Sequence, residues 1–425
     1  MTPPEAPTGL SEGGSAGTAP APDKWAEAIR SACSDVREAE DSDLVDGVAP
    51  SLVARPASTE QVAEVLRAAA AHGLSVVPRG RGTKMSWGMP PTSVDLVVDV
   101  SAMDRVLEHA AGDLIVSTQA GARLRDVQQT LAAGGQQLAV DETVDGGTIG
   151  GALATNATGP RRLFAGTWRD LLIGITVVRA DGVVAKAGGR VVKNVAGYDI
   201  GKLLIGSLGT LAVVTEAIFR LHPLPETQQW VTVPVDDPQD ALRLVQSVVH
   251  SQAVPTGIEV DWPVTGPGSV SVLLAGKADG VAGRARTVGE LLGAASSAAA
   301  DRPARWGSYP WGDGRTGLKL TFVLTGLGDV LATARETGAD LRGSGGTGVV
   351  YASVADPDRV PAAVERLRAV CARHLGSAVV VDGPPTVKRS VDVWGPVPAL
   401  DLMRRVKDRF DPDHRLSPGR FVGGI

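Results

Sequence analysis

The sequence predicts an α+β protein with two folded domains followed by a C-terminal segment. Its 425 residues exceed the usual length of one domain. Strand-like and helix-like patterns alternate up to Pro225, and a new rhythm with fewer glycine clusters begins after it. With 43% hydrophobic and 21% charged residues, the composition is that of a globular protein with real cores.

The first domain is expected over residues 23–225. Residues 1–22 are Pro, Gly, Ala, Ser and Thr with almost no large apolar groups, which predicts a disordered tail. Ser58 and Gln61 form a capping-box pattern before a helix that Gly73 ends. Short strands are predicted at 74–78, 94–100 and 114–120, with a helix at 124–135, and Asp181-Gly182 marks a β-hairpin turn.

The second domain is expected over residues 226–385, and a helix closed by Pro-containing turns lies in the segment 386–425. The Ala/Ser-rich stretch 294–300 is interpreted as a loop or helix end. The predicted strands are 230–236, 255–262, 270–276, 318–324 and 348–354, and the predicted helices are 237–249, 280–296, 329–338 and 361–375.

Composition also excludes several classes of function. A net charge of −5 gives no reason to expect nucleic-acid binding. No apolar run approaches the roughly 20 residues of a membrane span, and the N-terminus lacks a signal-peptide pattern, so a cytoplasmic location is expected. Cys33 and Cys371 are too few for an iron–sulfur cluster or a Cys-rich zinc site, and are expected to be unpaired thiols.

Glycine is concentrated in one part of the first domain: fourteen of the 52 glycines fall between Gly146 and Gly209. Glycine lets a ligand approach the main chain closely, which favours a large phosphate-bearing ligand here. The turn at 78–84, P-R-G-R-G-T-K, could form an anion nest, although such a turn alone is usually only a turn. It is neither a P-loop nor a Rossmann fingerprint, since Met85 stands where the third glycine would be.

The second glycine motif is more specific. Paired glycines flank Thr148-Ile149 in G-G-T-I-G-G-A-L-A-T-N, and Thr155 and Asn156 could add side-chain hydrogen bonds. A plain glycine-rich hairpin would not explain the start of a small-residue helix directly after it. Tyr198 is either a ligand contact or a core residue, and the sequence does not decide between the two.

Several ordered motifs carry a family resemblance. The second glycine motif, G-T-W-R-D, and the stretch from V-V-K-N-V-A-G-Y-D to L-H-P-L-P resemble FAD-binding proteins of the vanillyl-alcohol-oxidase/PCMH superfamily. Within it, K-N-V-A-G-Y-D and F-D-P-D-H-R-L-S-P-G-R are similar to the FAD-binding GlcE subunits of bacterial glycolate oxidase (glycolate dehydrogenase). The resemblance is strong over 48–225 and good over 405–423, but weak in the middle domain.

This resemblance implies a fold and a set of cofactor contacts. The fold would be a PCMH-type two-subdomain FAD-binding domain at 23–225, a smaller α+β cap domain at 226–385, and a segment at 386–425 that packs on the FAD domain. Ser417 stands where the family usually has Asn. The implied FAD-binding residues are Pro78, Arg79, Gly80, Arg81, Gly82, Thr83, Gly146, Gly147, Thr148, Ile149, Gly150, Gly151, Asn156, Gly159, Tyr198, Gly206, Gly209, Thr210, Val213, Gly419 and Arg420.

Two departures from the superfamily shape the functional expectation. No His or Cys lies where relatives attach FAD covalently, so non-covalent FAD is expected. The counterpart of the relatives' His-rich metal element, residues 343–354, contains no His, Asp, Glu or Asn, so no metal site and no obvious base are expected. His250 and His374 are expected to be surface or capping residues of predicted helices.

The favoured interpretation is therefore an FAD-binding subunit of a glycolate (2-hydroxy acid) oxidase or dehydrogenase complex, in an accessory or electron-relay role. The resemblance implies a catalytic FAD subunit and an iron–sulfur subunit as partners, through which any membrane contact would be made. One alternative is a free-standing FAD-linked oxidoreductase acting on a small hydroxy acid or alcohol; another is a scaffold that has lost its flavin. The free-standing enzyme would draw its base and substrate clamp from Lys193, Tyr198, Tyr351, Lys388 or Arg389.

Overall fold

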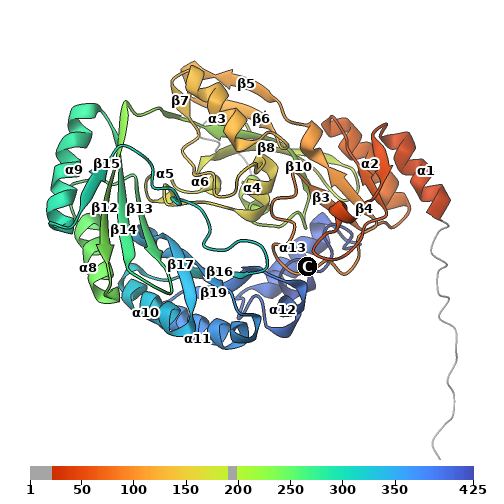
Figure 1. The fold of residues 1–425 in the computed structure, drawn as a ribbon. Helices are drawn as coiled ribbons and strands as arrows, with labels where there is room; N and C mark the ends of the chain where they lie inside the picture. The colour runs from red at the N-terminus through yellow and green to blue at the C-terminus, as the bar shows by residue number, and fades with distance from the viewer. Residues whose placement is uncertain (1–21, 190–198) are drawn as a thin grey trace, which may run out of the picture.

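The structure, a computed structural model, describes residues 22–189 and 199–425. Figure 1 shows the first domain in red to yellow-green and the second in green to blue, with the C-terminus at the first domain. The predicted tail lies outside the described residues except for Pro22, which begins α1 (Pro22–Ala32). The fold is mixed α and β, as the sequence predicted.

The first subdomain is a four-stranded sheet in the order β1-β2-β4-β3, with β2, β4 and β3 parallel. The helix α2 (Thr59–Ala71) begins at the predicted cap, where the Ser58 hydroxyl accepts the Gln61 N–H at 3.2 Å. The Gln61 side chain accepts the N–H of Ala57, one residue before the position that a capping box predicts. The strands are β1 (Val36–Glu38), β2 (Leu52–Ala54), β3 (Val76–Arg79) and β4 (Leu96–Asp99).

The second subdomain is a five-stranded antiparallel sheet in the order β5-β6-β10-β8-β9. The hairpin predicted at Asp181-Gly182 joins β8 to β9. The strands are β5 (Val106–Ala110), β6 (Ile115–Gln119), β8 (Leu172–Val178), β9 (Val184–Gly188) and β10 (Val213–Arg220), with β7 (Gln136–Gln137) and β11 (His222–Pro223) as a small extra pair. The helices are α3 (Leu124–Ala133), α4 (Ile149–Thr155), α5 (Arg162–Ala165), α6 (Trp168–Leu171) and α7 (Gly201–Leu204).

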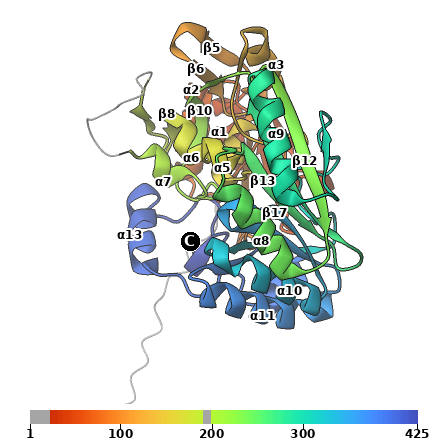
Figure 2. The ribbon, with the colours of Figure 1, turned by 90° about the vertical axis from the view of Figure 1, so that its left-hand side faces the viewer.

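The second domain is an eight-stranded antiparallel sheet in the order β15-β12-β14-β13-β17-β18-β16-β19. Its helices pack on one face through an apolar core, so the other face is turned toward the first domain (Figures 1 and 2). The strands are β12 (Thr227–Val235), β13 (Gly257–Trp262), β14 (Gly268–Gly276), β15 (Ser297–Ala299), β16 (Thr316–Thr321), β17 (Ala339–Ser344), β18 (Val349–Val354) and β19 (Ser377–Asp382). The helices are α8 (Pro238–Val249), α9 (Ala278–Leu292), α10 (Leu327–Thr337) and α11 (Val360–Arg373).

One expectation for this domain is wrong, and the strands β17 and β19 were not predicted. The loop or helix end predicted at 294–300 is wrong, because β15 pairs there with β12 and this tertiary pairing overrides the weak strand propensity of Ala. The strand β17 was not predicted, since Asp340, Arg342 and Ser344 occupy its alternate positions and hide the apolar pattern. His250 and His374 end α8 and α11 as C-cap residues, in agreement with the expected capping role.

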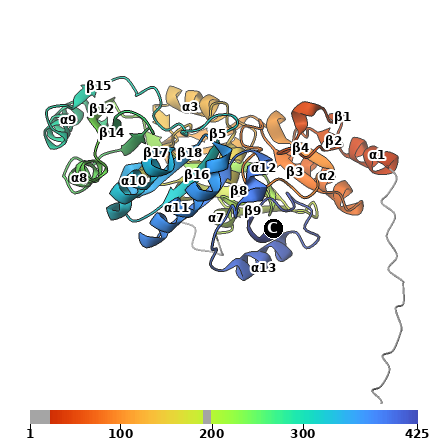
Figure 3. The same ribbon diagram turned by 60° about the horizontal axis from the view of Figure 1, so that its bottom comes forward.

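The C-terminal segment, with α12 (Pro385–Ser390) and α13 (Leu400–Phe410), returns to the first domain (Figure 3). Val76 of β3 donates its N–H to Arg415 and accepts the N–H of Ser417, both at 2.8 Å. The fully buried Lys407 ammonium donates to the Asp411 carboxylate and to the carbonyls of Thr210 and Leu416. Residues 410–420 are therefore held against both the first glycine turn and the stretch at 206–210.

Candidate functional site

The two glycine motifs meet face to face. A Cβ on Gly80 would lie 2.3 Å from the Oγ1 of Thr148, so no side chain fits at residue 80. A narrow pocket of about 70 Å³ lies between the motifs. Its lining includes Pro78, Arg79, Gly80, Arg81, Gly82, Thr83, Thr148, Gly151 and Arg420, nine of the residues singled out from the sequence, together with Leu208 and Lys84.

The helix α4 fixes the second motif. The Thr148 hydroxyl accepts the Gly151 N–H at 3.2 Å and caps the helix. The N–H groups of Ile149 and Gly150 donate to the carbonyls of Ala122 and Ala120, so these two residues anchor the helix to the loop after β6. What they present to a ligand is therefore bare backbone surface and not free N–H donors.

Two buried oxygens beside these motifs lack a hydrogen-bond partner. Asn156 adopts a left-handed conformation (φ 49°) at the end of α4, and its Oδ1 is buried and unpaired within the described residues. The Oγ of Ser417 is likewise buried and unpaired. Gly206 lies next to Asn156, and Gly209 packs between Pro78 and Ser417. Because unpaired buried polar atoms are rare, these oxygens fit a polar ligand that would complete their hydrogen bonds.

The other residues singled out from the sequence lie around the pocket or away from it. Gly147 is beside Lys84, and Gly146 donates its N–H to Glu142 at 3.2 Å. Gly159 packs on Asp141, whereas Thr210 and Val213 are buried where β10 begins. Gly419 has φ +79° and packs on Thr92, and Tyr198 lies outside the described residues.

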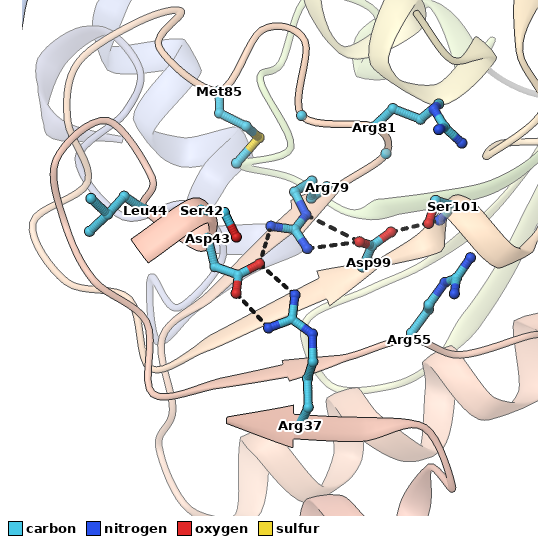
Figure 4. Close-up of a pocket in the computed structure, with 12 residues that line it drawn as sticks. Arg37, Ser42, Asp43, Leu44, Arg55, Arg79, Arg81, Met85, Asp99 and Ser101 are labelled. Atoms are coloured by element: carbon cyan, nitrogen blue, oxygen red, sulfur yellow. Dashed lines mark hydrogen bonds and ion pairs between the residues drawn. The ribbon is translucent and has the colours of Figure 1, made fainter. Parts of the chain in front are cut away.

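The Arg79 side chain also lines a second pocket of about 460 Å³ (Figure 4). Its guanidinium binds Asp43 and Asp99, each at 2.8 Å. Hydrogen bonds from Arg37, the Glu40 N–H and Arg79 hold the pKa of Asp43 well below its usual range, against the opposing effect of burial. Arg79 therefore braces the turn at 79–82 through its side chain.

The same pocket carries surplus positive charge. Arg55 and Arg81 line it without an acidic partner within residues 22–189 and 199–425. Figure 4 shows both guanidinium groups near the end of β4. The turn at 79–82 thus lines both this cationic pocket and the narrow pocket between the motifs.

Lys84 was not among the residues predicted from the sequence, although it ends the motif P-R-G-R-G-T-K. It is half-buried, and its Nζ would lie 3.5 Å from a Cβ on Gly147. Burial lowers the pKa of Lys84 to about 8, with Glu142 opposing the shift. An anionic ligand between the two motifs would restore the full charge of this ammonium.

An aromatic cluster joins the first motif to the second domain. Trp87 lies 5.3 Å from Tyr309, which stacks on Trp311 at 4.7 Å and meets the edge of Tyr351 at 4.6 Å, all between ring centroids. A larger pocket of about 580 Å³ lies beside it, lined by Thr83 and Trp87 from one domain and by Tyr309 and Trp311 from the other. This space extends from the glycine motifs to the second domain.

The residues considered as the base or substrate clamp of a free-standing enzyme lie in different surroundings. The Lys388 ammonium is fully buried in an ion pair with Asp46 and also donates to the Ser86 carbonyl, which indicates a structural role. Arg389 is exposed, Tyr351 is buried in the aromatic cluster, and Lys193 lies outside the described residues. Residues 343–354 comprise the end of β17, a short turn and β18, and no cluster of three metal-ligating side chains occurs among the described residues.

Two segments of the chain match known protein families. Residues 50–188 match the family described as FAD binding domain, and residues 394–421 match that of the FAD linked oxidases, C-terminal domain. The cofactor is FAD. The two matched segments contain both glycine motifs and the returning C-terminal residues, so the narrow pocket lined by Thr148 and Arg420 lies where the two segments meet.

Similar proteins include an oxidase subunit, a dehydrogenase and an FAD-linked oxidoreductase. The chain is 34% identical over 216 residues to glycolate oxidase subunit GlcD of Bacillus subtilis (50% of this chain, 46% of that protein). It is 33% identical over 208 residues to a D-lactate dehydrogenase of Archaeoglobus fulgidus (49% and 46%). In both cases the match spans about half the length of the relative. The FAD-linked oxidoreductase Rv2280 of Mycobacterium tuberculosis is 29% identical over 423 residues (88% and 91%).

A solved structure with a similar fold is alkyldihydroxyacetonephosphate synthase. The TM-score is 0.65 at 18% identity, covering 87% of this chain and 76% of the other. The likeness shows a shared fold of the PCMH type. None of the helices within residues 22–189 and 199–425 has the length and apolar character that a bilayer crossing requires.

Proposed function

We propose that this chain holds FAD non-covalently between the two glycine motifs and the returning C-terminal segment. The pocket shared by the two motifs contains no His or Cys among its lining residues, so it offers no side chain of the kind expected to attach a flavin. Asn156, Ser417 and Lys84 would contribute polar contacts, while Gly80 and Gly151 let the ligand approach the main chain. When bound, FAD supplies the electron-accepting chemistry.

We further propose that the chain is the FAD-binding subunit of a 2-hydroxy acid oxidase or dehydrogenase complex, with glycolate as the first candidate substrate. The similarity to proteins named glycolate oxidase subunit and D-lactate dehydrogenase supports this class of substrate. A catalytic FAD subunit and an iron–sulfur subunit would be its partners. In that complex the chain acts as an accessory or an electron relay.

The observation that carries the accessory role is the chemistry of residues 343–354. This segment consists of Ser, Gly, Thr, Val, Tyr and Ala only, so it supplies neither a metal ligand of the usual type nor a carboxylate or imidazole base. Anaerobic mixing of the isolated FAD-loaded chain with glycolate or D-lactate tests this directly. We expect no bleaching of its flavin alone, and substrate-dependent dye reduction once the two partner subunits are co-expressed.

A free-standing FAD-linked oxidoreductase is the second candidate. It is favoured by the match to Rv2280, an FAD-linked oxidoreductase that aligns over 91% of its own length. Rapid bleaching of the isolated chain by a small hydroxy acid or alcohol would establish this candidate and overturn the accessory role.

A further inference from the structure

The cationic pocket of Figure 4 lies at the carboxyl ends of the three parallel strands of the first subdomain. Arg79 is the last residue of β3, Asp99 is the last residue of β4, and Arg55 directly follows β2. Ligands of open α/β sheets bind in the crevice outside such strand ends. The volume of about 460 Å³ is large enough for a small molecule.

The charged side chains that line this pocket do not balance. Four of them are arginines and two are aspartates, which leaves two positive charges. The Asp43 carboxylate binds the guanidinium groups of Arg37 and Arg79, at 2.6 and 2.8 Å. Asp99 binds Arg79 from the other side, at 2.8 Å. These contacts neutralise both carboxylates and hold Arg79 in place.

Arg55 and Arg81 carry the surplus charge. Both are exposed, and neither has an acidic partner within the described part of the chain. Figure 4 shows them on either side of Ser101, which lines the same pocket. The Arg55 N–H donates to the Asp35 carbonyl at 2.8 Å, and Arg81 follows Gly80, which packs on the second glycine motif. The main chain therefore presents the two guanidinium groups from fixed positions.

The lining favours a compact anion over other ligands. Among the described residues that line the pocket, only Leu44 and Met85 have apolar side chains, so a nucleobase or an apolar protein segment would find little to pack on. A guanidinium holds a phosphate group with two parallel hydrogen bonds. Two guanidinium groups without acidic partners therefore fit a phosphate compound that carries at least two negative charges.

This pocket differs from the narrow one proposed for FAD. The two share the turn at 79–82 and Met85, but Thr148 and Leu208 line only the narrow pocket, and Arg55 lines only the wider one. A ligand bound between Arg55 and the strand ends would therefore leave the space between the two glycine motifs to the cofactor.

We propose that the cationic pocket binds a small phosphate compound, held by the guanidinium groups of Arg55 and Arg81, while FAD occupies its own site. The Ser101 hydroxyl, which lies between the two arginines, is a further donor. This binding requires no oxidation by the chain and does not depend on which acid the complex oxidises.

The experiment uses pyrophosphate, titrated into the FAD-loaded chain in a calorimeter at constant ionic strength set with potassium chloride. We expect one saturable site. Arg55→Met and Arg81→Met should each weaken the binding at least about tenfold. Arg55→Met should do so with unchanged FAD content, because Arg55 does not line the narrow pocket. Arg55→Lys keeps the charge but loses the paired hydrogen bonds, so its affinity should lie between those of the wild type and Arg55→Met.

Arg409→Met is the matched control. Arg409 is an exposed arginine on α13 that has no acidic partner among the described residues and does not line the pocket. Its affinity for pyrophosphate should equal that of the wild type. Non-saturable binding, unchanged affinity in both Arg55→Met and Arg81→Met, or an equal loss in Arg409→Met would overturn the proposal. Flavin released into the filtrate as pyrophosphate binds would also overturn it, since the pocket would then belong to the cofactor.

Discussion

At the scale of single residues, the site depends on places where a side chain cannot fit. Gly80 touches Thr148 so closely that any Cβ would collide with the threonine hydroxyl, and Gly209 packs on Pro78 in a left-handed conformation (φ +75°). Both contacts join segments far apart in the chain. Gly80 therefore holds the two glycine motifs close together, and Gly209 holds the stretch at 206–210 against the first of them.

Gly80→Ala should abolish FAD retention while the protein stays folded, because the added methyl group must displace Thr148 and with it the cap of α4. The flavin-to-protein absorbance ratio after gel filtration measures the effect. Gly112→Ala is the matched control, since nothing lies within 4 Å of its Cβ. Full FAD occupancy in Gly80→Ala would show that this contact does not shape the cofactor site.

The sequence identified these glycines but not the roles of the charged side chains. Arg79 was expected at the cofactor, yet its guanidinium is committed to Asp43 and Asp99. Lys388, considered as a catalytic residue, is committed to Asp46, which lies 342 residues earlier in the chain. Local spacing predicts backbone conformation well, whereas the partner of a long side chain depends on tertiary contacts that no local pattern contains.

Glu259 gives a prediction about pH. Its pKa is raised to about 8 in the folded protein, from an ordinary value of 4.5, so the folded state keeps a proton that the unfolded state loses. Stability should therefore fall as pH rises from about 4.5 to about 8. Glu259→Gln stays neutral and can still accept the Gly307 N–H, so urea unfolding at pH 9 should show it more stable than the wild type by up to about 4 kcal/mol.

The control for this prediction is Glu290→Gln, which changes an exposed carboxylate on α9. Its pH profile should follow the wild type. Glu259→Gln and the wild type should differ in how stability depends on pH between about 5 and about 9. If the two proteins show the same dependence, the buried carboxyl group is not the source of the fall in stability.

At the scale of elements, the local signals were reliable where a cap or turn residue marks a boundary. The Ser58 cap, the Asp181-Gly182 hairpin and the helix of the C-terminal segment were all predicted close to their observed positions. The strand β17 was missed because its polar residues serve the face toward the FAD domain. Functional strands break the apolar pattern by which strands are recognised.

The helix α13 supplies the main anchor of the C-terminal segment. Lys407→Met would leave the fully buried Asp411 carboxylate without its counter-ion, and we expect a loss of about 3–5 kcal/mol in the free energy of unfolding, measured in urea. Arg404→Met, on the same helix, removes an exposed pair with Asp401 and should cost no more than about 1 kcal/mol. Equal effects of the two substitutions would argue against the anchor.

At the scale of the whole molecule, the cofactor site is assembled from three separate parts of the chain. The FAD domain supplies the two glycine motifs, the C-terminal segment supplies Ser417 and Arg420, and the cap domain supplies Tyr309 and Trp311 to the adjoining larger pocket. The sequence predicted the first two parts because they carry recognisable motifs. The third was not predicted, since Tyr309 and Trp311 stand in no recognised motif and lie beside Trp87 only in the folded chain.

The central claim is that FAD is bound without a covalent bond, by backbone surfaces and a few polar side chains. Acid precipitation of the purified yellow protein, followed by mass spectrometry of the supernatant and the pellet, tests it most directly. We predict intact FAD in the supernatant and a polypeptide of unmodified mass in the pellet. Flavin that remains attached to the precipitated chain, or a protein that carries no FAD and takes up none when it is added, would contradict the account.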